Sequence, residues 1–193
     1  GPSKKASQLE GSKDFMKKLC KDFNIPTAEY ESFDNLLKAQ DFIKKSKHPL
    51  VIKSDGLAAG KGVTISNNVE ESIKCTKEIL EGKFKTSSKV VIEEFLEGEE
   101  ASYFVITDGE NYLPIGTAQD HKRIGENDTG LNTGGMGAYS PSLLITNDMQ
   151  EKINKKIIEP TIKSLNTIGC SFVGILYAGL MIKNNEPTLI EYN

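Results

Sequence analysis

The chain has 193 residues, of which 37% are hydrophobic, and its 24 basic and 27 acidic side chains leave a formal net charge of −3. This length suits one sizeable domain or two small ones. The mixed charges favour neither nucleic acid nor an anionic membrane surface as a partner. The apolar run 174–182 is far shorter than the roughly 20 residues of a membrane helix, and the N-terminus lacks the apolar segment of a secretion signal. Because the three cysteines are widely spaced, we expect free thiols and a cytoplasmic location.

Helical and strand patterns alternate along the chain, which predicts an α+β fold with mainly antiparallel hairpins. The predicted helices are 12–23, with Ser12 as N-cap, then 34–46, 68–81 and 147–168, the last one broken or kinked at Pro160. The predicted strands are 49–53, 62–66, 89–95, 100–107, 111–118, 171–183 and 187–193. A long polar segment, 119–141, is predicted as a functional loop.

The stretch 51–66, VIKSDGLAAGKGVTIS, places a lysine among glycines and alanines. A phosphate-binding P-loop needs G-x-x-x-x-G-K-[ST] between a strand and a helix. Here the spacing from Gly56 is one residue short, Gly62 replaces the Ser or Thr, and a strand follows instead of a helix. The stretch therefore indicates either a mobile loop carrying Lys61 that closes over phosphates, or a plain hairpin turn after Lys53.

An acidic stretch, 91–102, follows a predicted strand. The spacing Glu93-x-x-Leu96-x-x-x-Glu100 suits a linker that grips adenosine. Backbone groups near Phe95 and Leu96 would read the adenine edge, and Glu100 would bind the ribose hydroxyls. Taken alone, the stretch fits an acidic surface turn better.

Glu191 and Asn193 are two residues apart in a predicted strand, so both are expected on one face, together with Leu189. Two oxygen ligands, completed by ATP phosphate oxygens, suit Mg²⁺. Taken alone, the pair fits a solvent-facing polar edge better.

In combination, these features resemble the ATP-grasp superfamily. Lys13, Lys53, the loop 56–62, the linker 93–100 and the final Glu-x-Asn occur in the matching order. The closest resemblance is to the phosphoribosylamine–glycine ligase (glycinamide ribonucleotide synthetase) family. It is carried along the whole chain by VIKSDGLAAGKGV, EEFLEGEEAS, QDHKR followed by NTGGMGAYSP, and LIEYN. The pair QDHKR and NTGGMGAYSP is the most specific of these motifs.

The resemblance implies an ATP-grasp fold of two α+β lobes with ATP between them and a glycine-rich lid loop. The helical entry segment 1–28 would belong to the larger lobe, 29–93 would form the small lid subdomain, and 94–193 the larger subdomain, truncated at its C-terminal end. The family reaction joins glycine to 5-phosphoribosylamine with ATP and Mg²⁺ or Mn²⁺, through glycyl phosphate, in purine biosynthesis. The family also has N-terminal and C-terminal domains, so we expect this chain to be a fragment with little activity alone.

The resemblance also implies roles for individual residues. Lys13 and Lys53 would neutralise phosphate oxygens, Glu93 would join Leu96 and Glu100 at the adenosine, and Glu191 and Asn193 would hold the metal. The nucleotide-binding set is Lys13, Lys53, Gly56, Gly60, Lys61, Gly62, Glu93, Phe95, Leu96 and Glu100. The substrate-binding set, in the loop 119–141, is Asp120, His121, Lys122, Arg123, Asp128, Asn132, Thr133, Gly134 and Gly135.

Within these sets, Lys53 and Arg123 are expected to be catalytic, since phosphoryl transfer depends on charge neutralisation and alignment. Arg123 would clamp a phosphate or carboxylate, and Asp128 would hold the glycine ammonium group. His121, beside two cations, is either structural or a binding residue. The strand 174–182 has no additional metal carboxylate, so the metal would take two side chains only.

Two other functions fit part of the pattern. One is an ATP-grasp ligase that joins a different carboxylate and amine. The other is a non-catalytic nucleotide-binding module, against which stands the presence of every ATP and metal residue that the family pattern requires.

Overall fold

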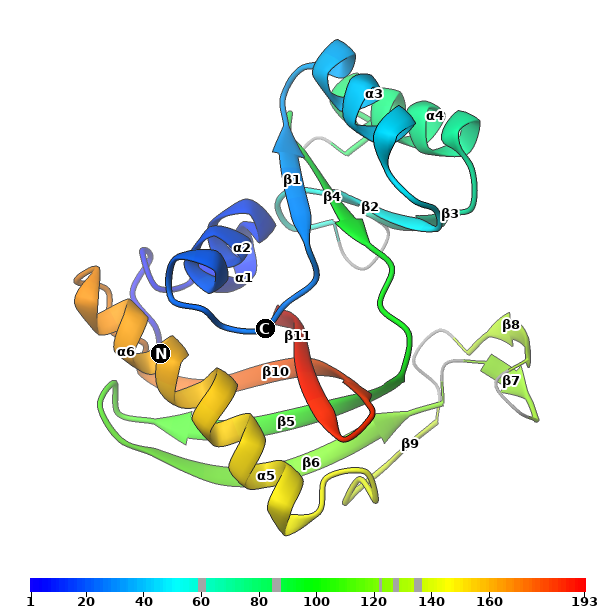
Figure 1. Cartoon of the computed structure of the whole chain (residues 1–193). Helices are drawn as coiled ribbons and strands as arrows, with labels where there is room; N and C mark the ends of the chain where they lie inside the picture. Colours follow the sequence, from blue (N-terminus) through cyan, green and yellow to red (C-terminus); the bar gives the residue numbers. More distant parts are fainter. Residues whose placement is uncertain (59–61, 85–87, 122, 127–128, 134–136) are drawn as a thin grey trace. The chain divides into compact units, whose positions relative to one another are not determined.

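A computed structural model of the chain describes all residues except 59–61, 85–87, 122, 127–128 and 134–136. The chain forms two compact units (Figure 1). Unit 1 comprises Gly1–Ala6, Phe23–Pro26 and Glu97–Asn193, and unit 2 comprises Ser7–Asp22 and Thr27–Leu96. This division differs from the expected one mainly in residues 7–22, which pack within unit 2 and not with the larger lobe.

Unit 2 contains a four-stranded antiparallel sheet in the order β1-β4-β2-β3, and helices α3 and α4 pack together on one of its faces (Figure 1). The strands are β1 (Tyr30–Phe33), β2 (Leu50–Ser54), β3 (Val63–Ser66) and β4 (Val90–Glu94); the helices are α3 (Leu36–Lys45) and α4 (Val69–Leu80). Asn35 and Asn68 cap the two helices by accepting backbone N–H groups of Lys38 and Glu71. Their shared core contains Ala39, Ile43, Leu50, Ile52, Ile79, Val90 and Ile92.

Side chains alternate between the two faces along β2 and β4, so the face of the sheet opposite α3 and α4 carries charged side chains. Ile52 and Ile92 pair across the strands and enter the core, so the next positions, Lys53 and Glu93, point to the opposite face. Helix α2 (Lys13–Asp22), preceded by the short α1 (Gln8–Gly11), contributes side chains to this face. Ser12 is the N-cap of α2, as predicted, and its Oγ accepts the backbone N–H of Phe15 at 3.1 Å.

Unit 1 contains a five-stranded antiparallel sheet in the order β11-β10-β5-β6-β9, with the helical segment 147–167 on one face (Figure 1). Its strands are β5 (Glu99–Thr107), β6 (Tyr112–Asp120), β9 (Ala138–Tyr139), β10 (Gly174–Lys183) and β11 (Glu186–Tyr192). The helical segment consists of α5 (Asn147–Ile153), the π-helical turn η1 (Asn154–Ile158) and α6 (Glu159–Thr167). Ile153, Ile157 and Leu165 of this segment are fully buried, as are Tyr103, Leu176 and Leu189 of the sheet. The Tyr103 hydroxyl donates to Asn154 Oδ1 at 2.9 Å and joins the sheet to the helical segment.

Three local features differ from the predicted elements. The break near Pro160 is a π-helical turn that ends just before it, and the proline, which has no N–H to donate, follows in the first turn of α6 within one continuous helical segment. The segment 119–141 is not purely a loop, because it contains the hairpin of β7 (Arg123–Gly125) and β8 (Thr129–Asn132), and β9.

The third difference is a β-bulge between β10 and β11. Gly179 pairs with Glu191, but the next residue, Leu180, pairs with Leu189, so Ile190 is the extra residue. Leu189 is fully buried, whereas Glu191 lines a pocket. The prediction that Leu189 shares the face of Glu191 is therefore wrong, because a bulge shifts the side-chain alternation by one position.

Gly98, just before β5, is a position where only glycine fits. Its φ angle is +147°, and a Cβ atom would lie 2.5 Å from the carbonyl oxygen of Ile182. We expect Gly98→Ala to lower the free energy of unfolding of unit 1 by about 2 kcal/mol or more, because backbone strain and a clash with backbone combine. Urea unfolding followed by circular dichroism measures this loss. Gly116→Ala is the matched control, since a Cβ there meets nothing within 4 Å; equal stability of the two variants would contradict the prediction.

Candidate functional site

The N-terminus of α2 is tied to the start of the glycine loop. The Asp55 carboxylate accepts the Ser12 hydroxyl at 3.1 Å and the backbone N–H of Asp14 at 3.1 Å. Lys13 donates its ammonium group to the carbonyl oxygen of Gly56 at 3.0 Å. These bonds bring together Lys13 and the loop, which are 43 residues apart in the sequence, and they hold the Lys13 ammonium group at the loop.

Three buried charged side chains meet on the sheet face opposite α3 and α4. The Glu93 carboxylate lies between two ammonium groups: Lys17 Nζ is 2.9 Å from Oε2, and Lys53 Nζ is 2.9 Å from Oε1. The side chains of Lys17, Lys53 and Glu93 are 0%, 6% and 4% exposed. Lys17 and Glu93 come from different elements, α2 and β4, so only the folded unit creates this group, which we call the Lys-Glu-Lys triad.

The triad carries one more positive than negative charge. Removing a charge from water is unfavourable unless it is paired, and here two cations share one carboxylate. Burial lowers the pKa of Lys17, and the Glu93 carboxylate partly opposes that effect. An anion bound beside Lys53 would balance the excess charge, which makes this face suited to phosphate.

Hydrogen bonding in the triad is also incomplete. Glu93 Oε1 is buried and has no hydrogen-bond partner, because the close approach of Lys53 lacks hydrogen-bond geometry. Within the described part of the chain, Glu93 is the only ion-pair partner of Lys53, whose ammonium group has three donors. A buried acceptor without a hydrogen bond is rare in folded proteins, and here Oε1 has only its ion pair with Lys53. A bound ligand with both an anionic group and an N–H donor would satisfy both side chains.

The glycine loop is described at its two ends. Gly56 has a φ of +87°, which favours glycine. At Gly62 a Cβ would lie 2.6 Å from the Ala58 Cβ, so the loop can turn this tightly only with glycine there. Gly60 and Lys61 lie outside the described residues.

The linker 93–100 begins in unit 2 and ends in unit 1. The Glu94 carboxylate accepts the backbone N–H of Glu29 at 3.0 Å, which fixes the end of β4. Phe95 is exposed and Leu96 half-buried, whereas Glu100 lies at the start of β5, in a pocket of unit 1. Apolar side chains at the end of β4 are compatible with contact to a flat base.

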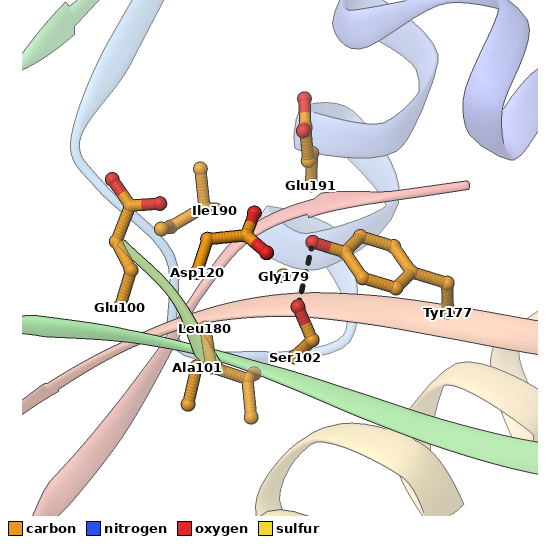
Figure 2. Close-up of a pocket in the computed structure, with 9 residues that line it drawn as sticks. All are labelled: Glu100, Ala101, Ser102, Asp120, Tyr177, Gly179, Leu180, Ile190 and Glu191. Atoms are coloured by element: carbon orange, nitrogen blue, oxygen red, sulfur yellow. Dashed lines mark hydrogen bonds between the residues drawn. The ribbon is translucent and has the colours of Figure 1, made fainter. Parts of the chain in front are cut away.

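The pocket of unit 1 lies on the sheet face opposite the helices and has a volume of about 40 Å³, room for an ion or a water and not for a whole substrate. Figure 2 shows the carboxylates of Glu100, Asp120 and Glu191 on one side of the sheet, whereas Ala101 and Leu180 point to the other side. The Ser102 hydroxyl donates to Tyr177 Oη at 3.3 Å at the edge of this pocket.

The floor of the pocket is kept open by Gly179. A Cβ at this position would lie 3.2 Å from Tyr177 Oη and 3.4 Å from Glu191 Cγ. Asn193 comes directly after β11 and continues its pairing with β10, because its backbone N–H and carbonyl groups exchange hydrogen bonds with those of Tyr177. Oxygen donors at Glu191 and Asn193 are of the type that Mg²⁺ prefers. Nowhere in the described ranges do three or more His, Cys, Asp or Glu side chains form a metal-binding group, so a metal at Glu191 would need further oxygens from a ligand.

The structure places only part of the predicted substrate loop. Asp120 lines the pocket. Two hydrogen bonds hold the backbone of His121: its N–H donates to the carbonyl oxygen of Gly137 at 2.9 Å, and its carbonyl oxygen accepts the Thr133 hydroxyl at 2.6 Å. Arg123 and Asn132 are paired across the β7–β8 hairpin. Lys122, Asp128, Gly134 and Gly135 lie outside the described residues.

Two charged residues at the site, Lys17 and Asp55, were not predicted from sequence, and neither were Ser102, Tyr177 and Gly179 at the pocket of unit 1. Lys17 follows the apolar Met16 on an amphipathic helix, where a lysine is usually exposed to solvent. Asp55 comes directly before Gly56, and an Asp-Gly pair usually indicates a turn. Only the four-residue spacing between Lys13 and Lys17, which places both on one side of α2, was a usable signal. Conversely, Cys20 is no candidate nucleophile, because burial raises the pKa of its thiol to about 12.

Comparison with known proteins decides the family. A model of the family described as "Phosphoribosylglycinamide synthetase, ATP-grasp (A) domain" matches residues 11–193. The chain belongs to this family. The predicted membership is thereby confirmed.

Named relatives agree with this family membership. A chloroplastic phosphoribosylamine–glycine ligase of Arabidopsis thaliana is 53% identical to the present chain over 197 residues, which include all of this chain and 37% of the relative. A crystal structure of a phosphoribosylamine–glycine ligase from Thermotoga maritima superposes with a TM-score of 0.91 at 37% identity, over all of this chain and 49% of that one. The ATP-grasp domain thus spans less than half the length of these relatives.

The ATP-grasp fold itself is confirmed. One solved structure with this fold is the biotin carboxylase domain of the 2-oxoglutarate carboxylase from Hydrogenobacter thermophilus, determined with MgADP. It superposes with a TM-score of 0.77 at 20% identity, over all of the present chain and 41% of the biotin carboxylase chain. At this identity the likeness concerns the fold alone. Among the described helices of the domain, none has the length and apolar character needed to cross a membrane.

Proposed function

We propose that this domain binds ATP and a divalent cation, Mg²⁺ or Mn²⁺, and forms the ATP-using part of a phosphoribosylamine–glycine ligase. The observation that carries the nucleotide half is the Lys-Glu-Lys triad, with its excess buried positive charge and its open acceptor at Glu93. The substrate half is supported by the names of relatives that match the whole chain at about 50% identity.

In this proposal, unit 2 supplies the nucleotide contacts. Lys53 donates to phosphate oxygens, and Lys13 joins it when its bond to Gly56 O is exchanged for one to phosphate. Glu93 Oε1 accepts from the base, and the backbone near Phe95 and Leu96 lies along the base edge. The glycine loop 56–62, including Gly60, Lys61 and Gly62, closes over the phosphates and excludes water from a reactive acyl phosphate.

Unit 1 supplies the metal and substrate contacts in this proposal. Glu191 and Asn193 hold the cation, which when bound neutralises phosphate charge. Glu100 binds ribose hydroxyls, and Asp120 and His121 lie where the substrate loop begins. The remaining substrate contacts are assigned to Lys122, Arg123, Asp128, Asn132, Thr133, Gly134 and Gly135.

The reaction is a phosphoryl transfer followed by an acyl transfer. A glycine carboxylate oxygen bonds to the γ-phosphorus of ATP while the bond from that phosphorus to the bridging oxygen breaks, releasing ADP and forming glycyl phosphate. The ribosylamine nitrogen then attacks the acyl carbon, phosphate leaves, and the nitrogen loses a proton. Lys53 and Arg123 would stabilise the negative charge that both transition states share.

The relatives' greater length suggests how the enzyme is completed. Because the domain covers 37–49% of those chains, we propose that N-terminal and C-terminal domains of the same polypeptide bind the ribosylamine. The domain alone would then bind ATP weakly and turn over little.

Two measurements test the proposed function. Isothermal titration of the 193-residue chain is expected to show ATP binding that tightens when Mg²⁺ is added. For the ligase that carries the domain, phosphate release in the presence of phosphoribosylamine is expected with glycine and not with alanine or serine. Metal-indifferent binding would indicate the non-catalytic module instead, and release with another amino acid would indicate a different ATP-grasp ligase.

A further inference from the structure

Lys17 is a buried cation to which the proposed reaction assigns no role. Its Nζ lies 2.9 Å from Glu93 Oε2, 2.8 Å from Thr27 Oγ1 and 3.2 Å from the carbonyl oxygen of Ala28. An ammonium group has three N–H donors, and the three acceptors account for them. The ring of Tyr30, 5.7 Å from Nζ, lies beside the same group. Lys17 therefore has no donor left for a ligand and can influence binding only through the groups that it holds.

Glu93 is the held group with a connection to the candidate nucleotide site. Lys17 occupies Oε2, which leaves Oε1 directed at Lys53 and without a hydrogen bond. If Lys17 were absent, both carboxylate oxygens would compete for the single ammonium group of Lys53, which would draw that group away from a phosphate.

The geometry points to an indirect role, and we propose that Lys17 is a positioning residue for nucleotide binding. It holds Glu93 by one oxygen, so that the other oxygen aligns Lys53 and stays open toward the nucleotide base. The inference rests on the proposed nucleotide binding and adds to it a residue that does not touch the ligand. A purely structural lysine would instead affect stability, with no dependence of its binding effect on Glu93.

A double-mutant cycle tests this role. ATP affinity in Mg²⁺ is measured by isothermal titration for the wild-type chain, Lys17→Met, Glu93→Gln and the double variant. Methionine keeps most of the length of the lysine side chain but donates no hydrogen bond. We expect Lys17→Met to weaken ATP binding about tenfold in the wild-type background and less than about twofold in the Glu93→Gln background, where no carboxylate remains to be positioned.

The matched control is Lys18→Met, which changes an exposed lysine of the same helix and is expected to leave ATP affinity unchanged. Equal weakening by Lys17→Met in both backgrounds, or no weakening in either, would overturn the positioning role. A wild-type chain that binds no ATP would overturn the proposed function as well, which is a separate and recognisable result.

Loss of folding is addressed by a milder variant. If circular dichroism shows that Lys17→Met is unfolded, Thr27→Val replaces it in the cycle, because it removes one acceptor of Lys17 and leaves both charges in place. We then expect about threefold weaker ATP binding, again only where Glu93 is a carboxylate. Threefold weakening in both backgrounds would contradict the proposal.

Discussion

Replacing Lys53 is expected to weaken ATP binding by about 30-fold or more, because truncating one partner of a buried charged hydrogen bond costs roughly 2–5 kcal/mol. The cause is the loss of the only triad ammonium group that has donors left for phosphate. Isothermal titration of Lys53→Ala against the wild-type chain, both in Mg²⁺, measures the change. Lys74→Ala, which removes an exposed lysine of α4 in the same unit, is the control.

The same position yields a prediction that separates binding from stability. In Lys53→Met the triad retains the Lys17–Glu93 ion pair and loses its excess charge, while the apolar stem of residue 53 is nearly preserved. We expect the unfolding temperature without nucleotide to stay the same or rise, since residues selected for ligand binding often cost stability. An affinity within twofold of the wild type would contradict the phosphate role of Lys53, whatever the unfolding temperature.

Glu191→Gln is expected to remove the Mg²⁺ dependence of ATP affinity. Glutamine keeps the shape of the side chain and one oxygen but loses the negative charge that attracts the cation. Replacing a residue that only supports a metal ligand already lowers metal affinity roughly 10-fold to 100-fold, so the loss of a ligand's charge should have at least that effect. The measurement is the ratio of ATP affinities with and without Mg²⁺, which we expect to fall to nearly one. In the ligase that carries the domain, turnover should fall in parallel.

The control for this variant lies on the same strand. Glu186→Gln removes an exposed carboxylate of β11 that pairs with Lys152 and Lys156 and does not line the pocket. It should leave the Mg²⁺ dependence intact. A Glu191→Gln variant that still needs Mg²⁺ to the same degree would place the metal on other ligands.

Several elements of the fold were predictable because their signals are local. Strands β2, β4, β5 and β10 have the apolar alternation or runs that predict them, and α2 has both its amphipathic pattern and its Ser12 cap. The motifs around QDHKR and the glycine loop predicted the family, which the family model confirms over residues 11–193. Such patterns depend on residues close together in the chain.

Other elements had no local signal. The short β1 and α1 contain too few residues for a periodic pattern, and the two-residue β9 exists because it pairs with the end of β6. The bulge that separates Leu189 from the face of Glu191 depends on register against β10. In each case the partner strand or the packing, and not the segment itself, determines the structure.

The sequence by itself determined the family of this domain, because its lysines, its glycine loop, its acidic linker and its Glu-x-Asn ending are local motifs. Only the tertiary structure decided that Lys17, from α2, closes onto Glu93, 76 positions later, and so converts two lysines and one carboxylate into a buried, positively charged site. The physical reason is that the energy of a buried charge depends on every charge and hydrogen bond around it, and those neighbours come from strands and helices that only folding brings together.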